Sequence, residues 1–190
     1  METDAPPFLD GRILIAMPGM GDPRFARSVV FMCAHSSDGA MGLIINKPAR
    51  QMRFPDLLGQ LEIEATEETP DLSVHFGGPV EHGRGFVLHS SDYSVEEGTL
   101  AIDERFGMTA TMEILRDIAA GRGPGDALLM LGYSGWGPGQ LEGEIQQNGW
   151  LIGEADRELL FEVPDAGKWD RAVTAMGVDP AMLSAEGGRA

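Results

Sequence analysis

The sequence predicts an α+β domain, and three observations lead to that prediction. The chain has 190 residues, of which 43% are hydrophobic, so it can bury the core of one domain. Runs rich in β-branched residues and segments with helical periodicity follow one another in mixed order. The sequence has no internal repeat and no low-complexity linker. We therefore expect a single soluble domain.

The first part of the chain predicts a strand, a short helix and a hairpin. RILIAMP at 12–18 has a strand pattern, and Asp22 before Pro23 is typical of the cap and first position of a short helix. VVFMCAH at 29–35 and MGLIINK at 41–47 are separated by SSDGA, in which Asp-Gly supplies the positive φ of a tight turn. We expect these two strands to be antiparallel neighbours.

Helices and strands also alternate after residue 54. A short helix begins at Pro55, and the acidic segment 62–71 follows as an exposed loop. LSVHF and RGFVLHSS, joined by GGPVEHG, predict a second hairpin-like pair. Thr109 or Thr111 caps a helix that ends at Gly121. ALLMLGY is expected as a buried strand, and WDRAVTAMG as a last helix that ends at Gly177.

The most distinctive stretch is GYSGWGPGQLEGEIQQNGW at 132–150, which we compared with two catalytic templates. A nucleophile elbow, Gly-x-Ser-x-Gly, needs its second glycine one place after Gly135. A dinucleotide-binding loop, Gly-x-Gly-x-x-Gly, needs a glycine where Gln140 stands. Neither template fits, so the glycines are expected to shape the backbone.

A helix-start pattern explains more of this stretch. Gly137 suits the N-cap, Pro138 the first helical position, and Gln140 can bond back to the cap. Trp136 and Leu141 then form a hydrophobic staple, and Asn-Gly at 148–149 ends the helix before a strand.

Two features of this helix leave alternatives open. Gly143 lies in its interior, where glycine costs about 1 kcal/mol relative to alanine. Gln140, Glu144 and Asn148 form a polar row along one face. Close backbone packing or a ligand-facing surface explains both features. We expect packing at Gly143, so that Gly143→Ala would cost about 1–3 kcal/mol.

Charge is unevenly distributed along the chain. Residues 1–53 hold six basic and five acidic residues, whereas residues 54–190 hold eight basic and twenty-five acidic residues. Nucleic-acid binding depends on Lys and Arg that neutralise phosphates, so direct DNA binding is disfavoured. The segment NKPARQMR at 46–53 is the most favourable one for an anion, although a solvated surface loop is the ordinary interpretation.

The compartment is expected to be the cytoplasm. The N-terminal METDAPPFLDG carries acids where a secretory signal carries basic residues. The longest uncharged run, Ala127 to Leu141, is too short and too rich in glycine to span a membrane. Cys33 is the only cysteine, so an internal disulfide is excluded, and its setting predicts a buried thiol rather than a nucleophile.

Three blocks resemble the signature blocks of the YqgE/AlgH family in order and spacing: ILIAMPGMGDPRFARSVVFMCAHSSDGAMGLIINKP, HFGGPVEHGRGFVLHSSD and LGYSGWGPGQLEGEIQQNGWL. The resemblance covers residues 11–178, with flexible segments expected at 1–10 and 179–190. It implies an α+β fold in which a bent, mostly antiparallel sheet forms a pseudo-barrel flanked by helices. The family is largely uncharacterised, and its transcriptional-regulator label rests on a genetic association with alginate production. The resemblance implies no catalytic residues.

Three classes of function remain open at this point. The first is a non-catalytic regulatory or interaction module whose acidic surface meets a protein partner. The second is a small-molecule binder or enzyme with a cleft between the first and third blocks. The third is direct DNA binding, which the charge disfavours. A concave pocket that joins those two blocks would favour the second class, and a flat apolar patch would favour the first.

We identify six candidate ligand-binding residues and no catalytic residue, cofactor or metal site. They are Asn46, Lys47, His89, Trp136, Gln140 and Glu144. His75 and His89 could approach each other and hold a metal with Glu144, but the sequence lacks a short histidine spacing on a helix. Hydrogen-bonded strand histidines are the ordinary alternative.

The acidic body leads to a first prediction. The purified protein should show no salt-sensitive binding to duplex DNA at physiological ionic strength, because its overall field repels phosphates. An electrophoretic mobility assay over a range of salt concentrations checks this. Tight, sequence-specific retardation of DNA by the protein alone would contradict it.

Overall fold

The computed structural model describes residues 8–19 and 22–186. The strands are β1 (Arg12–Ala16), β2 (Val29–Ser36), β3 (Gly39–Ile44), β4 (Val74–Phe76), β5 (Val80–Ser90), β6 (Thr99–Ala101), β7 (Phe106–Thr109), β8 (Ala127–Trp136) and β9 (Trp150–Glu154). The helices are α1 (Phe54–Gln60), α2 (Met112–Ala119), α3 (Gln140–Gln146), α4 (Asp165–Ala175) and α5 (Pro180–Glu186). Two short turns of helix complete the list, η1 (Pro23–Phe25, 3-10) and η2 (Glu158–Glu162, π).

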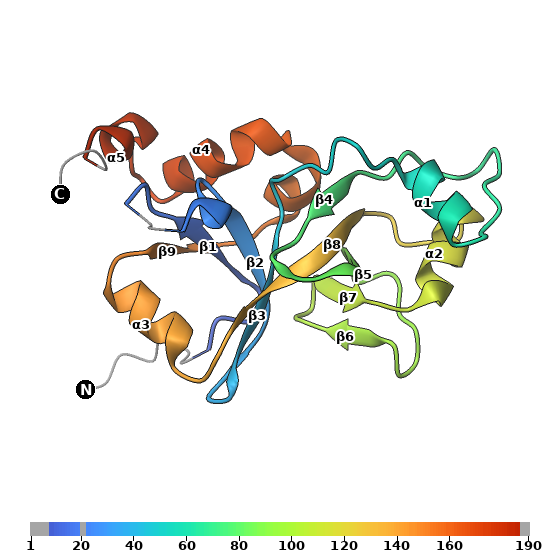
Figure 1. Cartoon of the computed structure of the whole chain (residues 1–190), viewed down its shortest axis with the longest axis horizontal. Helices are drawn as coiled ribbons and strands as arrows, with labels where there is room; N and C mark the ends of the chain where they lie inside the picture. Colours follow the sequence, from blue (N-terminus) through green and yellow to red (C-terminus); the bar gives the residue numbers. More distant parts are fainter. Residues whose placement is uncertain (1–7, 20–21, 187–190) are drawn as a thin grey trace.

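The strands form one bent sheet in the order β6-β7-β5-β8-β3-β2-β1-β9, with β4 also paired to β8. Every pairing between these strands is antiparallel except that of β4 with β8. Figure 1 shows the sheet bending where β3 meets β8, with helices on its outside. The predicted α+β class and the bent, mostly antiparallel pseudo-barrel are confirmed.

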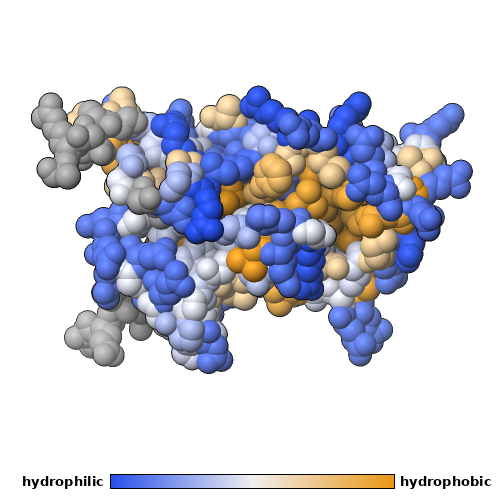
Figure 2. Space-filling model, in the orientation of Figure 1, coloured by the Kyte–Doolittle hydropathy of each residue, from blue (hydrophilic) through white to orange (hydrophobic). Residues whose placement is uncertain are grey.

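Helices cover the sheet on both sides of this bend. α4 lies on β1 and β2, where the Trp169 indole donates to the Ala16 carbonyl oxygen at 2.8 Å. α1 and α2 pack on the other half of the sheet through the fully buried Phe54, Leu58 and Ile114. Figure 2 shows apolar side chains gathered over β4, β8 and the adjoining side of α1, surrounded by hydrophilic residues. No helix in the described part of the chain is long and apolar enough to cross a membrane.

A buried cation fixes α4 to the sheet. Lys168 donates from Nζ to the carbonyl oxygens of Ile45 and Leu160 at 2.8 and 3.1 Å, and lies 3.0 Å from Asp165 Oδ1. Burial lowers the pKa of Lys168, and the charge of Asp165 opposes that shift. His75 Nε2 lies 2.9 Å from Asp165 Oδ2, so the same carboxylate also links α4 to β4.

Most predicted elements are confirmed, but the second hairpin is wrong. β4 and β5 do not pair with each other, because β8 lies between them. The chain crosses β8 at a point where glycines permit close approach. A Cβ on Gly78 would overlap the Tyr133 carbonyl group, and one on Gly132 would lie 2.6 Å from the Gly78 oxygen. His75 and His89 therefore lie on strands that β8 separates.

Within the segments 1–10 and 179–190, the structure describes residues 8–10 and 179–186. The Leu9 amide donates to His35 Nδ1 at 3.1 Å, and the His35 amide donates to Asp10 Oδ1 at 3.0 Å. α5 forms within 179–190 because Pro180 opens it and Asp179 Oδ1 accepts from the Ala181 amide at 3.0 Å. Residues 1–7 and 187–190 lie outside the described residues.

The start of α3 differs from the prediction. The helix begins at Gln140 rather than Pro138, because Gly139 has a φ of 74° and this left-handed conformation cannot belong to a helix. The expected bond is nevertheless present, since Gln140 Oε1 accepts from the Gly137 amide at 2.9 Å. Trp136 and Leu141 share one buried cluster, as the staple predicts.

The expectation of close packing at Gly143 is also wrong. A Cβ on this residue would have no neighbour within 4 Å beyond the adjacent helix backbone. Its methyl group would therefore enter open space, and the helix-propensity cost of glycine has no packing compensation.

We accordingly predict that Gly143→Ala stabilises the fold by a few tenths to about 1 kcal/mol. Gly42→Ala serves as the contrasting control, since a Cβ there would lie 2.6 Å from Val30 Cγ1 and 3.1 Å from the Phe31 oxygen. That control should be destabilised by about 1–3 kcal/mol. Urea melts of both variants measure the difference, and a lowered midpoint for Gly143→Ala at constant slope would contradict the prediction.

Candidate functional site

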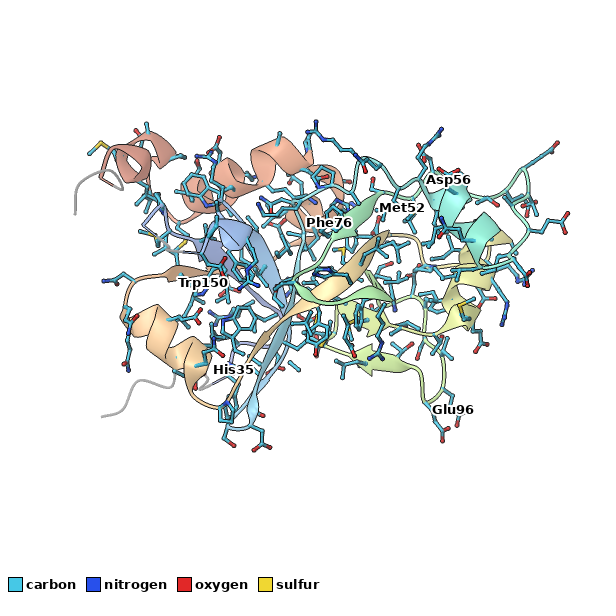
Figure 3. The ribbon with its side chains drawn as sticks, viewed as in Figure 1. His35, Met52, Asp56, Phe76, Glu96 and Trp150 are labelled. Atoms are coloured by element: carbon cyan, nitrogen blue, oxygen red, sulfur yellow. The ribbon has the colours of Figure 1, made fainter. Side chains whose placement is uncertain are left out.

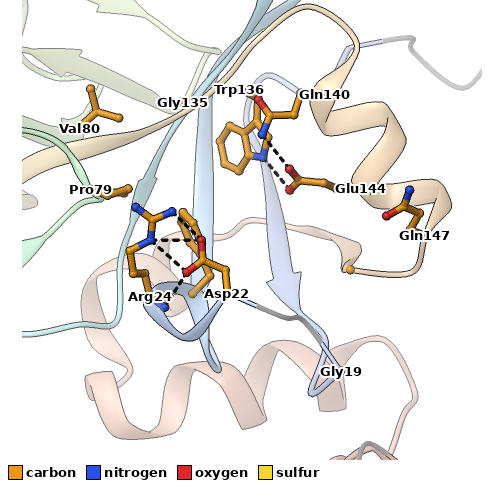
Figure 4. Close-up of a pocket in the computed structure, with 12 residues that line it drawn as sticks. Gly19, Asp22, Arg24, Pro79, Val80, Gly135, Trp136, Gln140, Glu144 and Gln147 are labelled. Carbon is orange, nitrogen blue, oxygen red and sulfur yellow. Dashed lines mark hydrogen bonds and ion pairs between the residues drawn. The ribbon is translucent and has the colours of Figure 1, made fainter. Parts of the chain in front are cut away.

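Figure 3 shows His35 and Trp150 in the half of the molecule that carries α3, whereas Met52 and Asp56 lie toward the opposite end. A pocket of about 460 Å³ opens in the first of these halves, beside α3, η1 and the end of β8 (Figure 4). It is lined by Gly19, Asp22, Arg24, Phe25, Pro79, Val80, Gly135, Trp136, Gln140, Glu144, Gln147 and Gly149. The lining thus brings together all three sequence blocks.

One wall of the pocket is a charged pair at η1. The Asp22 carboxylate accepts from the Arg24 amide at 3.0 Å, which caps η1 as the sequence predicts. Arg24 Nη2 donates a hydrogen bond to Asp22 Oδ2 at 2.7 Å. This side-chain hydrogen bond lowers the pKa of Asp22, so the carboxylate stays ionised near neutral pH. The pair fixes an acceptor and a cation at the mouth.

The floor of the pocket is aromatic. The Phe25 ring lies 6.5 Å from the Trp136 ring in a stacked arrangement with an interplanar angle of 30°. Trp150 meets both rings edge-on, at 5.6 Å from Phe25 and 6.0 Å from Trp136. Such edge and offset contacts stabilise aromatic clusters beyond the area that they bury. The three rings therefore support one another's positions without a ligand.

Glu144 holds this aromatic cluster in place from α3. Its Oε1 accepts from both indoles, from Trp136 Nε1 at 3.0 Å and from Trp150 Nε1 at 2.9 Å. Its Oε2 accepts from Gln140 Nε2 at 3.0 Å. Hydrogen bonds to an ionised acceptor are about twice as strong as neutral ones. Glu144 is thus a structural clamp whose carboxylate also faces the pocket.

Gln147 is the polar side chain of the lining that stays free for a ligand. It is exposed at the C-cap of α3, and its side-chain amide makes no hydrogen bond to another residue in the described part of the chain. Figure 4 shows it one turn along α3 from Glu144, on the same side of the pocket. Its carbonyl and amino groups provide one acceptor and two donors at the rim.

Three of the six candidate residues lie together here, and three lie elsewhere. Trp136, Gln140 and Glu144 line the pocket, whereas Asn46, Lys47 and His89 are not in its lining. Asn46 Oδ1 accepts from the Val29 amide, and its Nδ2 donates to the Arg27 carbonyl oxygen, each at 2.9 Å. Lys47 Nζ donates to the Ala26 carbonyl oxygen at 2.9 Å. Asn46 and Lys47 thus tie down the loop that leads into β2.

His89 belongs to a buried hydrogen-bond chain in the other half of the sheet. Its Nδ1 lies 2.8 Å from the Ser90 carbonyl oxygen and therefore carries the proton, so its Nε2 accepts from the Thr109 hydroxyl at 2.8 Å. Thr99 lies 2.7 Å further along. Burial lowers the pKa of His89, which keeps the imidazole neutral. This neutral histidine holds β5, β6 and β7 together.

Candidate metal ligands and nucleophiles do not converge in the described residues. No group of three His, Cys, Asp or Glu side chains is placed to hold a metal ion there. Cys33 is buried, and desolvation raises the pKa of its thiol. Ser134 is also buried and donates from Oγ to the Gly77 carbonyl oxygen at 3.1 Å. These side chains act in the structure as packing and hydrogen-bonding groups.

Several lining residues were missed as site candidates. Asp22, Phe25, Pro79 and Val80 belong to the sequence blocks that carry the family resemblance, but local spacing does not reveal that they meet α3. Gln147 is the i+3 neighbour of Glu144, whereas the polar row followed the i+4 spacing to Asn148 and passed over it.

The clamp generates a prediction about Glu144. An amide in place of the carboxylate cannot accept from both indoles and from Gln140 with equal strength, so Glu144→Gln should destabilise the fold by about 1–3 kcal/mol. The fluorescence spectrum of Trp136 and Trp150 should change as well. Glu142→Gln is unsuitable as a control because Glu142 contacts His35 at 2.6 Å. Gln146→Ala on the exposed side of α3 is the matched control. An unchanged urea midpoint for Glu144→Gln would contradict the clamp.

Comparison with known proteins places this architecture in a family. The AlgH-like (DUF179) family model matches residues 13–181. A UPF0301 protein of Methylobacterium sp. (strain 4-46) is 55% identical over 96% of this chain and 90% of its own. A UPF0301 protein of Jannaschia sp. (strain CCS1) is 57% identical over 96% of this chain and 95% of its own.

Solved structures agree with this assignment. The solution structure of the AlgH protein from Pseudomonas aeruginosa superposes with a TM-score of 0.80 at 39% identity, over the whole of both chains. The crystal structure of a protein from Corynebacterium diphtheriae shares the fold, with a TM-score of 0.72 at 20% identity over 97% of this chain and 93% of the other. The resemblance seen in the three sequence blocks is confirmed, and the chain belongs to the AlgH-like (UPF0301) family.

Proposed function

We propose that the protein is a non-catalytic binding module that takes up a small organic molecule in the pocket beside α3. The observation that carries the proposal is the composition of this pocket, where an aromatic floor faces a rim of orienting polar groups. Small-molecule sites commonly combine an apolar surface with a few such groups, in volumes of about 300–1,000 Å³. The pocket also joins the first and third sequence blocks, the geometry that favours a small-molecule binder.

The chemistry of the lining supports binding rather than catalysis. Its described residues include no Ser, Cys, His or Lys, the side chains that most often serve as nucleophiles or bases. The two carboxylates are already engaged, Asp22 with Arg24 and Glu144 with the two indoles. Proton transfer to either carboxylate would weaken these contacts and so disrupt the walls of the pocket.

The electrostatics of the pocket define the class of ligand. Asp22 and Glu144 carry two negative charges against the single positive charge of Arg24, and the whole chain carries a net charge of −16. A neutral or cationic molecule is therefore favoured over an anion. The rings of Phe25 and Trp136 suit a planar ring, over which a cation is also stabilised. We propose a planar nitrogen-containing ring or aromatic amine as the ligand class.

A regulatory role in the cytoplasm completes the proposal. A non-catalytic module that binds a ligand acts by changing its contact with a partner protein. Such a module would regulate transcription indirectly, without contacting DNA itself. The excess of acidic residues supports this distinction. The lone thiol of Cys33 is suited to a reducing compartment.

Two probes with the same ring and opposite charges test the pocket. Tryptamine should bind with a Kd of about 0.1–1 mM, as about 0.4 kcal/mol per heavy atom implies, and indole-3-acetate should bind at least about tenfold more weakly. Isothermal titration gives both affinities, and chemical shift changes in the labelled protein give the site.

Matched variants on α3 provide the control. Gln147→Ala removes a lining amide and should weaken tryptamine binding about three- to tenfold, whereas Gln146→Ala removes an exposed amide outside the lining and should leave it unchanged. Tighter binding of indole-3-acetate would contradict the ligand class. Equal effects of the two variants, or shifts confined to other residues, would contradict the site.

A further inference from the structure

A buried histidine links the first described residues of the chain to α3. His35 Nδ1 accepts from the Leu9 amide at 3.1 Å, and His35 Nε2 lies 2.6 Å from Glu142 Oε1 on α3. The His35 side chain is 2% exposed, and the Phe8 ring meets it edge-on at 5.2 Å. Figure 3 shows His35 near the end of β2, beside α3. We call these four residues the N-terminal latch.

A bulge in β2 turns His35 toward this position. Side chains alternate between the two faces of a strand, so His35 would ordinarily lie on the opposite face from Met32. Between Met32 and Ala34, however, the register with β3 shifts by one residue. The extra residue brings His35 to the face of Met32, where Leu9 and α3 also pack.

The two contacts of the ring fix where its protons lie. An amide N–H can only donate, so the nitrogen that accepts from Leu9, Nδ1, carries no proton. A neutral imidazole has one ring proton, which therefore lies on Nε2 and is donated to Glu142. The contacts thus correspond to the neutral Nε2–H form of His35.

A second proton on the ring would affect these two contacts in opposite ways. It can bind only at Nδ1, where it would place an N–H group against the Leu9 N–H at 3.1 Å. The ring is too buried for water to replace the lost acceptor, so the Leu9 amide would be left unsatisfied. The contact with Glu142 would become a charged pair and would gain strength. Protonation therefore opposes the contact with Leu9 and retains the contact with α3.

The charged groups around His35 act in the same sense as Glu142. Asp10 Oδ1 accepts from the His35 backbone amide at 3.0 Å, which places a second carboxylate beside the residue. Glu144, the other acid of α3, is held by the two indoles. β3, which pairs with this end of β2, contains no ionisable residue. These carboxylates attract a positively charged ring, whereas the Leu9 amide opposes it.

From this arrangement we propose that His35 is a pH-sensitive latch, which holds Phe8 and Leu9 while its ring is neutral and releases them when the ring takes up a second proton. Histidine is the side chain whose charge ordinarily changes between about pH 5 and 8. Leu9 packs in the buried cluster that contains Trp136 and Leu141, so its release would loosen the packing beneath α3. The proposal does not depend on ligand binding, because the latch residues lie outside the lining of the ligand pocket.

Nuclear magnetic resonance of the isotope-labelled full-length protein follows both ends of the latch from about pH 8 to about pH 5. Long-range spectra of the ring nitrogens should show a proton on His35 Nε2 alone at the upper end of this range. As Nδ1 gains its proton, the Leu9 amide shift should move with the same midpoint. The hydrogen-exchange protection factor of this amide, which is corrected for the intrinsic pH dependence of exchange, should fall at least about tenfold because the amide loses its acceptor.

Three variants separate the latch from a general effect of acid. His35→Asn places an amide oxygen near the position of Nδ1 and does not titrate in this range, so the Leu9 amide should stay protected throughout. Glu142→Gln removes the charge that pairs with the protonated ring, so release should require a lower pH. His82→Asn removes an exposed histidine of β5 and should leave the response of Leu9 unchanged.

Four outcomes would overturn the proposal. One is a proton on His35 Nδ1 at the upper end of the range. Another is a ring that takes up no second proton by the lower end, or one that does so while the Leu9 amide keeps its protection. The third is loss of that protection in His35→Asn, folded by circular dichroism, with the midpoint of the unmodified protein. The fourth is an unchanged midpoint of release in Glu142→Gln, which decides the question if His35→Asn does not fold.

Discussion

The fold depends on β8, which serves both halves of the sheet. Its first residues pair with β4 on one side and β5 on the other, and its last three pair with β3 beyond the bend. Gly132, with a φ of 77°, lies where these pairings change. A side chain there would collide with the backbone of Gly78, so the strand could not bend this closely beneath the crossing chain. The pocket begins at Gly135 and Trp136 after the bend, so its position depends on this change of strand partner.

A shared hydrogen-bond acceptor preorganises the pocket. One carboxylate satisfies two indoles and an amide, so the ring positions are set before a ligand binds and little ordering entropy remains to be lost. A preorganised pocket suits selection of one compact molecule.

Local pattern was sufficient wherever neighbouring residues decide the conformation. Asp-Gly at 38–39 predicted the β2–β3 hairpin, and Asp22 with Pro23 predicted η1. Trp136, Gln140 and Glu144 lie within nine residues, so spacing alone brought them together.

The pairing of β4 with β8 joins residues more than fifty positions apart and depends on close approach at Gly78 and Gly132, which no local propensity encodes. Asn46 and Lys47 were expected at the site because they belong to the first sequence block and begin the basic segment 46–53. A polar side chain after a strand can equally well tie down a loop, as both do here.

The distribution of charge along the chain bears on binding at the pocket. The excess of negative charge lies after residue 53, and this region supplies Glu144 of the pocket. At a physiological Debye length of about 8 Å, distant charges are largely screened, so the acids beside the pocket matter more than the net charge of −16. The ligand pocket contains a cation, Arg24, but Asp22 holds it in a bidentate pair and competes with any anion for its donors. Selectivity for neutral or cationic ligands is therefore a local property of the pocket, and it should survive changes in net charge made elsewhere on the molecule.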